Sequence, residues 1–121
     1  MKAEYREVLC LFALKWLSKF RDPDIGYTEL IAPQMGEECR KLGFDMNAGK
    51  AFCEKYGIRF NDYRALKRII GEIEDISLLG SAIYSNWRYF NHWAYSGTEI
   101  LQEENRGWFI IALEQLEALT A

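Results

Sequence analysis

The single histidine, His92, limits the chemistry that this chain of 121 residues can perform. A metal site with two histidines and the H-E-x-x-H motif are both excluded. Ser85 lies seven residues before His92, which is two turns of a predicted helix and too far for a nucleophile–base hydrogen bond. Arg88 lies one turn before His92, where a second cation repels a protonated imidazole and creates no general base. These residues therefore predict no catalytic centre.

Three cysteines, Cys10, Cys39 and Cys53, share no close spacing. The sequence has no C-x-x-C pair, so it indicates neither a redox motif nor a zinc knuckle. A zinc site built from these thiols and His92 would lack any motif spacing, and we expect no metal and no cofactor. The odd number of cysteines also argues against a disulfide framework, which favours the reducing cytoplasm.

The apolar run from Val8 to Leu14 contains seven residues. A transmembrane helix needs about 20, and no clear cleavage pattern follows the charged residues that precede this run. The sequence thus predicts a cytoplasmic protein that is neither secreted nor embedded in a membrane.

The segment 44–50 shares isolated features with two ligand-binding motifs. Asp45 and Asn47 alternate like the start of a calcium-binding loop, but the glycine is out of register and Tyr56 stands where that loop needs glutamate. The following Gly-Lys pair lacks the upstream glycine and the hydroxyl residue of a phosphate-binding loop. We therefore interpret Asn47 as a helix N-cap.

Aromatic residues gather in the stretch 83–95, which holds two of the four tryptophans and three of the seven tyrosines. Successive residues placed 100° apart align one apolar stripe with a second beside it. The stripe contains Ile76, Leu79, Ile83, Trp87, Phe90 and Ala94, and Leu78, Ala82, Tyr89 and Trp93 lie beside it. This wide apolar arc predicts a central helix over about 76–95, covered by neighbours on more than one side.

A polar and aromatic strip follows the other side of this helix. It comprises Tyr84, Arg88, Asn91, His92 and Tyr95, with Ser81 and Ser85 beside them. Tyrosine and arginine are enriched at the energetic centres of protein interfaces, so the strip is a candidate interface with another protein. The alternative is that the same side chains cap buried helix ends.

Asn86 interrupts the apolar arc, between Trp93 and Leu79. A buried amide without partners costs roughly 1–3 kcal/mol, so its side chain needs hydrogen bonds. A structural bond to a neighbouring helix end is the favoured interpretation. The alternative is a small-ligand pocket, or an enzymatic site, centred on Asn86, Trp93 and His92.

Charge is unevenly distributed along this acidic chain, whose formal net charge is −3. Residues 1–70 hold thirteen Lys and Arg against ten Asp and Glu, whereas residues 71–121 hold two against eight. The basic cluster of Arg59, Arg64, Lys67 and Arg68 makes nucleic-acid binding an alternative function. The overall acidity and the lack of clear helix-turn-helix spacing argue against it.

Helical periodicity and turn signals divide the chain into five or six helices. They are expected over about 3–20, 33–42, 48–56, 62–74, 76–95 and 103–119, with a short helical turn up to Ala32. The expected N-caps are Thr28, Asn47, Asn61 or Asp62, and Ser77, with Pro33 at a first helical position and Gly43, Gly57 and Gly97 at helix ends. The prediction is a compact all-α bundle, a single domain over 1–121, around the central helix.

The first predicted helix has more apolar residues than one face can hold. Its buried face is expected to contain Tyr5, Val8, Leu9, Phe12, Ala13, Trp16, Leu17 and Phe20. Leu11 and Leu14 fall on the polar side. There they either contact a second neighbour or mark a partner surface.

The function expected from these patterns is recognition of another macromolecule by a small non-enzymatic helical protein. Another protein is the expected partner, in an adaptor, inhibitor or subunit role. A homo-oligomer is compatible with this expectation. Nucleic-acid association and small-ligand binding or catalysis are the two alternatives.

Overall fold

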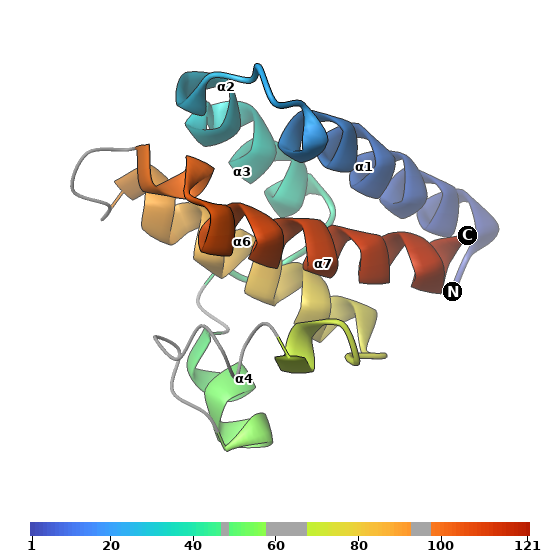
Figure 1. Cartoon of the computed structure of the whole chain (residues 1–121). Coiled ribbons are helices and arrows are strands. Elements are labelled where there is room, and N and C mark those ends of the chain that lie inside the picture. The colour runs from blue at the N-terminus through green and yellow to red at the C-terminus, as the bar shows by residue number, and fades with distance from the viewer. Residues whose placement is uncertain (47–48, 58–67, 93–97) are drawn as a thin grey trace.

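The computed structural model describes residues 1–46, 49–57, 68–92 and 98–121 (Figure 1). The helices are α1 (Ala3–Arg21), α2 (Tyr27–Ile31), α3 (Pro33–Lys41), α4 (Gly49–Tyr56), α6 (Ile76–His92), the 3₁₀ helix η1 (Thr98–Leu101) and α7 (Glu103–Thr120). These ranges contain no strand, so the predicted all-α fold is confirmed. None of their helices has both the length and the hydrophobicity needed to cross a membrane.

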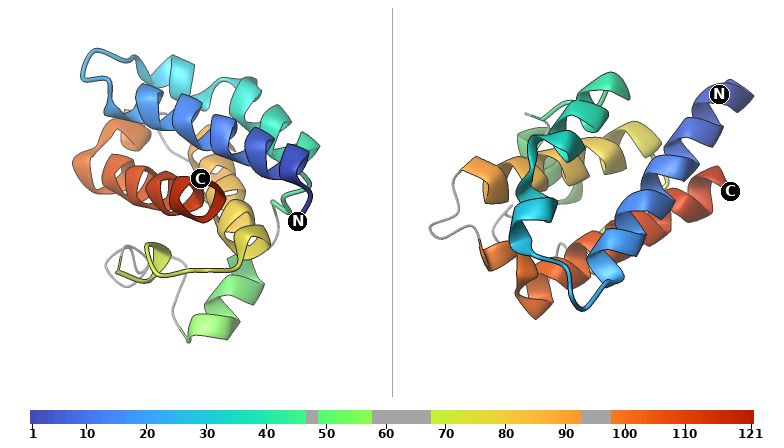
Figure 2. Two further views of the ribbon diagram at one scale, coloured as in Figure 1. Left: turned by 90° about the vertical axis from the view of Figure 1, so that its right-hand side faces the viewer. Right: turned by 90° about the horizontal axis from the view of Figure 1, so that it is seen from above.

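The helices α1 and α7 run antiparallel and make the most extensive helix contact of the described residues. At one end, Arg6 donates to the carbonyl oxygens of Thr120, at 3.2 Å, and Ala121, at 2.6 Å. At the other end, Arg106 donates to the carbonyl oxygen of Phe20. The helix α6 crosses this pair, α1 lies between α7 and α3, and α4 lies beyond α6 (Figure 2).

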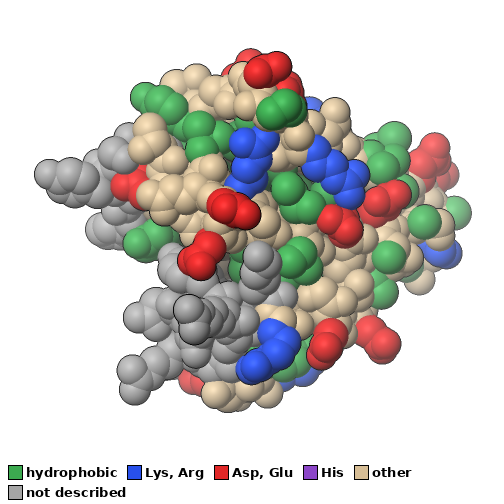
Figure 3. Space-filling view, in the orientation of Figure 1, with side chains coloured by type: hydrophobic (Ala, Val, Ile, Leu, Met, Phe, Trp, Pro, Cys, Tyr) green, Lys and Arg blue, Asp and Glu red, His purple; other side chains and the backbone are tan. Residues whose placement is uncertain are grey.

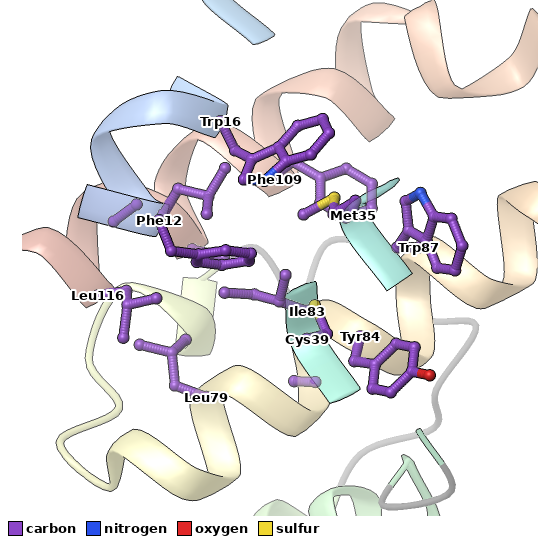
Figure 4. Close-up of a cluster of buried hydrophobic side chains, with 14 of the residues drawn as sticks. Phe12, Trp16, Met35, Cys39, Leu79, Ile83, Tyr84, Trp87, Phe109 and Leu116 are labelled. Atoms are coloured by element: carbon purple, nitrogen blue, oxygen red, sulfur yellow. The ribbon is translucent and has the colours of Figure 1, made fainter. Parts of the chain in front are cut away.

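The apolar stripe of α6 lies in the core, as its periodicity predicts. Leu79, Ile83, Trp87 and Phe90 are buried, and Ile76 is half-buried. In the close-up, Ile83 lies among side chains from α1, α3 and α6 (Figure 4). Among the described residues of the arc, Tyr89 differs from its neighbours because it is exposed.

Several helix ends lie where the turn residues predict. Pro33 occupies the first turn of α3. Gly43 and Gly57 have φ angles of 84° and 65°, the left-handed geometry in which glycine ends a helix without strain. Ile100, in the 3₁₀ helix η1, is fully buried.

Two predicted N-caps are wrong. The side chain of Asp75 caps α6, because its Oδ1 accepts a hydrogen bond from the backbone N–H of Leu78 at 3.1 Å, and Ser77 lies inside the helix. The helix α2 already begins at Tyr27, after Gly26, so Thr28 lies in its first turn. Asn47, Asn61, Asp62 and Gly97 lie outside the described residues.

One predicted helix ends earlier than expected, and another is described only in part. Of the predicted helix over 62–74, the structure describes 68–74, where helical geometry ends at Ile70. The central helix is described as far as His92, and residues 93–95 of its predicted span lie outside the described ranges.

Candidate functional site

The polar strip of α6 is covered over much of its length by residues 44–46. Tyr84 is 9% exposed, and Ser81 and Ser85 are buried. The Ser85 hydroxyl donates to the carbonyl oxygen of Met46 at 2.6 Å, and the backbone N–H of Asp45 donates to Ser81 Oγ at 3.0 Å. This part of the strip is therefore buried within the fold, whereas a candidate interface with another protein needs an exposed surface.

Two further members of the strip make contacts within the fold. Arg88 is half-buried, with its Nη1 3.2 Å from the sulfur of Met46. Asn91 is exposed, and its Nδ2 donates to the carbonyl oxygen of Ile31 at 2.6 Å. The His92 side chain and Tyr95 lie outside what the structure describes. A protein interface on this strip stays a prediction.

Asn86 is buried, at 3% exposure. Its Nδ2 has no hydrogen-bond partner among the described residues, so this nitrogen does not make the structural bond that the sequence favours. Trp93, the other member of the predicted pocket, lies outside those residues. Of the predicted basic cluster, Arg68 is described and exposed, whereas Arg59, Arg64 and Lys67 fall in the undescribed range 58–67.

An exposed apolar surface on α1 is the site that sequence periodicity located only in part. Val8 is 51% exposed, Leu11 59% and Leu14 45%, and Tyr5 is also exposed. Tyr5 and Val8 were expected in the core, and that expectation is wrong. These four residues, spaced three apart along one helix, are called the α1 ridge below. In the space-filling view, hydrophobic side chains lie between acidic and basic groups in the part of the molecule where α1 and α7 run (Figure 3).

A groove of about 360 Å³ opens beside the ridge, between α1 and α3. Its lining residues are Tyr5, Val8, Leu11, Phe12, Lys15, Glu38, Lys41 and Leu42. Apart from one carboxylate and two ammonium groups, these side chains are apolar or aromatic. The groove can therefore receive a bulky apolar side chain and place charged groups of both signs around it.

Polar contacts fix the two walls of the groove relative to each other. The indole Nε1 of Trp16 donates to Glu38 Oε2 at 2.6 Å, and Lys15 pairs with the other oxygen of Glu38. The Tyr5 hydroxyl donates to the carbonyl oxygen of Leu42 at 2.6 Å. These bonds connect α1 to α3 and to the residue that follows it, so the shape of the groove is set before any partner binds.

The thiols of Cys39 and Cys53 are poor nucleophiles. Burial raises the pKa of the Cys39 thiol, and the neighbouring Glu38 carboxylate raises it further. Burial likewise raises the pKa of Cys53, with a contribution from Glu54. Both thiols therefore stay protonated at neutral pH. Within the described part of the chain, no three His, Cys, Asp or Glu side chains gather closely enough to hold a metal ion.

Comparison of the chain with protein-family models, with curated proteins and with solved structures finds no match. Function must therefore be inferred from the α1 ridge and the groove beside it.

Proposed function

We propose that this chain is a protein-recognition domain that binds a helical segment through the α1 ridge and the groove between α1 and α3. The proposal rests on the exposure of the side chains of the α1 ridge. Six large hydrophobic side chains are exposed among the described residues, and five of them lie within the first fourteen positions of the chain. Isolated exposed hydrophobics are ordinary, whereas a contiguous patch is typical of a binding surface.

The spacing of the ridge favours a helix as the bound element. Side chains three residues apart form a continuous ridge on a helix, and such a ridge packs between the four-residue rows of a second helix. The groove beside it offers apolar walls to one large side chain of that partner. A helical partner would remove Leu11 and its neighbours from water, at roughly 25 cal/mol for each Å² of apolar surface buried.

The charges around the ridge favour protein over nucleic acid as the partner. Glu4 and Glu7 lie on the exposed side of α1, and Glu38 lines the groove together with Lys15. A phosphate backbone requires a surface of predominantly positive charge. A rim of both signs suits the polar edge of a protein interface.

Substitution of Leu11 tests the proposal. Leu11→Asp places a charge at the centre of the ridge, and we expect it to abolish the capture of partners that the wild-type chain retains under quantitative cross-linking in its native host. The melting temperature should stay close to wild type, because Leu11 is already 59% exposed and contributes little to the core.

Tyr89→Asp is the matched control, because Tyr89 is an exposed large side chain on α6, 42% accessible and away from the ridge. It should retain every partner of the wild-type chain. Identical sets of partners for wild type, Leu11→Asp and Tyr89→Asp would contradict the proposed surface.

A further inference from the structure

The charges along α1 identify a partner for the ridge, an inference that rests on the proposed function. We infer that the helical segment bound by the ridge is α1 of a second copy of this chain, packed antiparallel about a two-fold axis beside Leu11. Symmetric pairing through one shared surface is the commonest architecture of soluble oligomers. It requires a surface that is complementary to itself.

The exposed side of α1 has this self-complementarity. Glu4 and Glu7 occupy its first half and are exposed, whereas the partly exposed Lys15 and Lys19 occupy its second half. An antiparallel pair therefore sets the acidic half of each copy against the basic half of the other, and does so twice by symmetry. A parallel pair would set like charges against each other, which is unfavourable.

Centring the pair on Leu11 gives a definite register. Each residue then lies level with the residue equally far on the other side of Leu11 in the second copy. Glu4 comes level with Ser18, between Lys15 and Lys19 of that copy, and Val8 comes level with Leu14. The two Leu11 side chains meet at the centre. Val8, Leu11 and Leu14 are thus buried between the two copies while opposite charges flank them.

Contacts within each copy hold the basic half of the surface in place. Lys15 and Lys19 lie over the ring of Trp16, with their Nζ atoms 5.4 and 5.5 Å from its centroid, and Lys15 also pairs with Glu38. These contacts reduce the side-chain freedom that would be lost on pairing. A single helix from each copy gives a small interface, so we expect a weak dimer that depends on protein concentration.

Sedimentation velocity over a roughly hundredfold concentration range, chosen because small interfaces are weak, tests the inference. The wild-type mass should rise from 14.2 kDa towards twice that value. Glu4→Lys and Lys19→Glu should each remain monomeric alone, because each places like charges across the two-fold axis. An equimolar mixture of the two variants should regain dimers, since both contacts between positions 4 and 19 of the heterodimer then pair opposite charges.

Glu103→Lys is the matched control for the change in charge. Glu103 is exposed in the first turn of α7, as Glu4 is in the first turn of α1. This variant should dimerise like the wild-type chain. Circular dichroism spectra of all the variants should match wild type, because the substituted side chains lie at the surface. Leu11→Asp changes no residue of the charge pairs and should also stay monomeric. It therefore tests the apolar centre of the interface independently of the charges.

A wild-type chain that stays at 14.2 kDa throughout would overturn the inference, and so would a mixture that gains no dimer over its separate components. Capture of a different protein that depends on Leu11, by a chain that is itself monomeric, would sink the inference and leave the proposed function standing. If the wild-type chain neither dimerises nor captures any protein in a way that depends on Leu11, the inference and the proposed function are both overturned.

Discussion

Gly36 and Gly80 let aromatic rings lie directly against the backbone of their helices. A Cβ atom at Gly36 would come within 2.4 Å of the Trp87 ring, and one at Gly80 within 2.1 Å of the Phe44 ring. Such distances are far inside van der Waals contact, so any side chain would displace the ring. Gly36 thereby sets how closely α3 approaches α6, and with it the wall of the groove that carries Glu38.

The substitution Gly36→Ala should destabilise the fold by about 1–3 kcal/mol, since the added methyl group overpacks the contact with Trp87. Urea unfolding followed by circular dichroism measures this change. Gly26→Ala is the control, because its Cβ would meet its nearest neighbour, Thr28 Oγ1, at an ordinary 3.7 Å. Equal loss of stability in the two variants would show that close packing at Trp87 is not the cause.

At the same scale, Tyr5 and Val8 show what periodicity leaves open. Val8 lies on the flank of the apolar arc that includes Leu9, Phe12 and Trp16, whereas Tyr5 lies within that arc but in the first turn of α1. The pattern correctly predicts the burial of Leu9, Phe12 and Trp16. Whether the flank is also covered depends on how α3 approaches α1. A contact between helices far apart in the sequence leaves no trace in the spacing of α1 itself.

At the scale of the element, either Asp75 or Ser77 could supply the N-cap of α6. Ser77 was the predicted cap, yet Asp75 accepts the N–H of Leu78 through its side chain, and its carbonyl oxygen accepts the N–H of Leu79 at 2.9 Å. Aspartate and serine have similar capping strength. The sequence therefore located the start of α6 to within two residues but could not choose between them.

Asp75→Ala should lower the free energy of unfolding by about 1 kcal/mol, the usual value of an N-cap side chain. The matched control is Ser77→Ala, which removes an exposed hydroxyl within the first turn and should cost less. Thermal and chemical denaturation of both variants measures the difference. A larger loss in Ser77→Ala than in Asp75→Ala would contradict the assignment of the cap.

The covered strip of α6 shows a second limit at this scale. Its residues were placed correctly on one side of the helix, but residues 44–46 supply Met46 and Asp45 as partners for Ser85 and Ser81. Polar side chains on a helix look alike in sequence whether solvent or a crossing segment satisfies them. The fold class was therefore predictable, whereas the exposed surface was not.

At the scale of the whole molecule, one contiguous core joins α1, α3, α6 and α7. Phe20 and Phe109 stack across α1 and α7 with their ring centroids 4.8 Å apart. Cys39 lies fully buried in the same core. Access of reagent to this thiol should therefore report unfolding of the core as a unit.

In native protein, a thiol reagent should modify the partly exposed Cys10 and Cys53 first and Cys39 much later. Burial shields Cys39 and raises its thiol pKa, which lowers the fraction of reactive thiolate. Mass spectrometry of labelled peptides over time measures the order. Under mild denaturant the labelling of Cys39 should accelerate in step with global unfolding, and early labelling without denaturant would contradict a closed core.

The hydrogen bonds that Arg6 donates to the carbonyl oxygens of Thr120 and Ala121 hold the two ends of the described chain together. The N-terminal end of α1 and the C-terminal end of α7 therefore lie side by side (Figure 1). A short linker could therefore join the two ends. Such a linker would lower the conformational entropy of the unfolded chain and would leave the folded chain unchanged. The closed chain could then be opened at the turn between α1 and α2 to give a circular permutant.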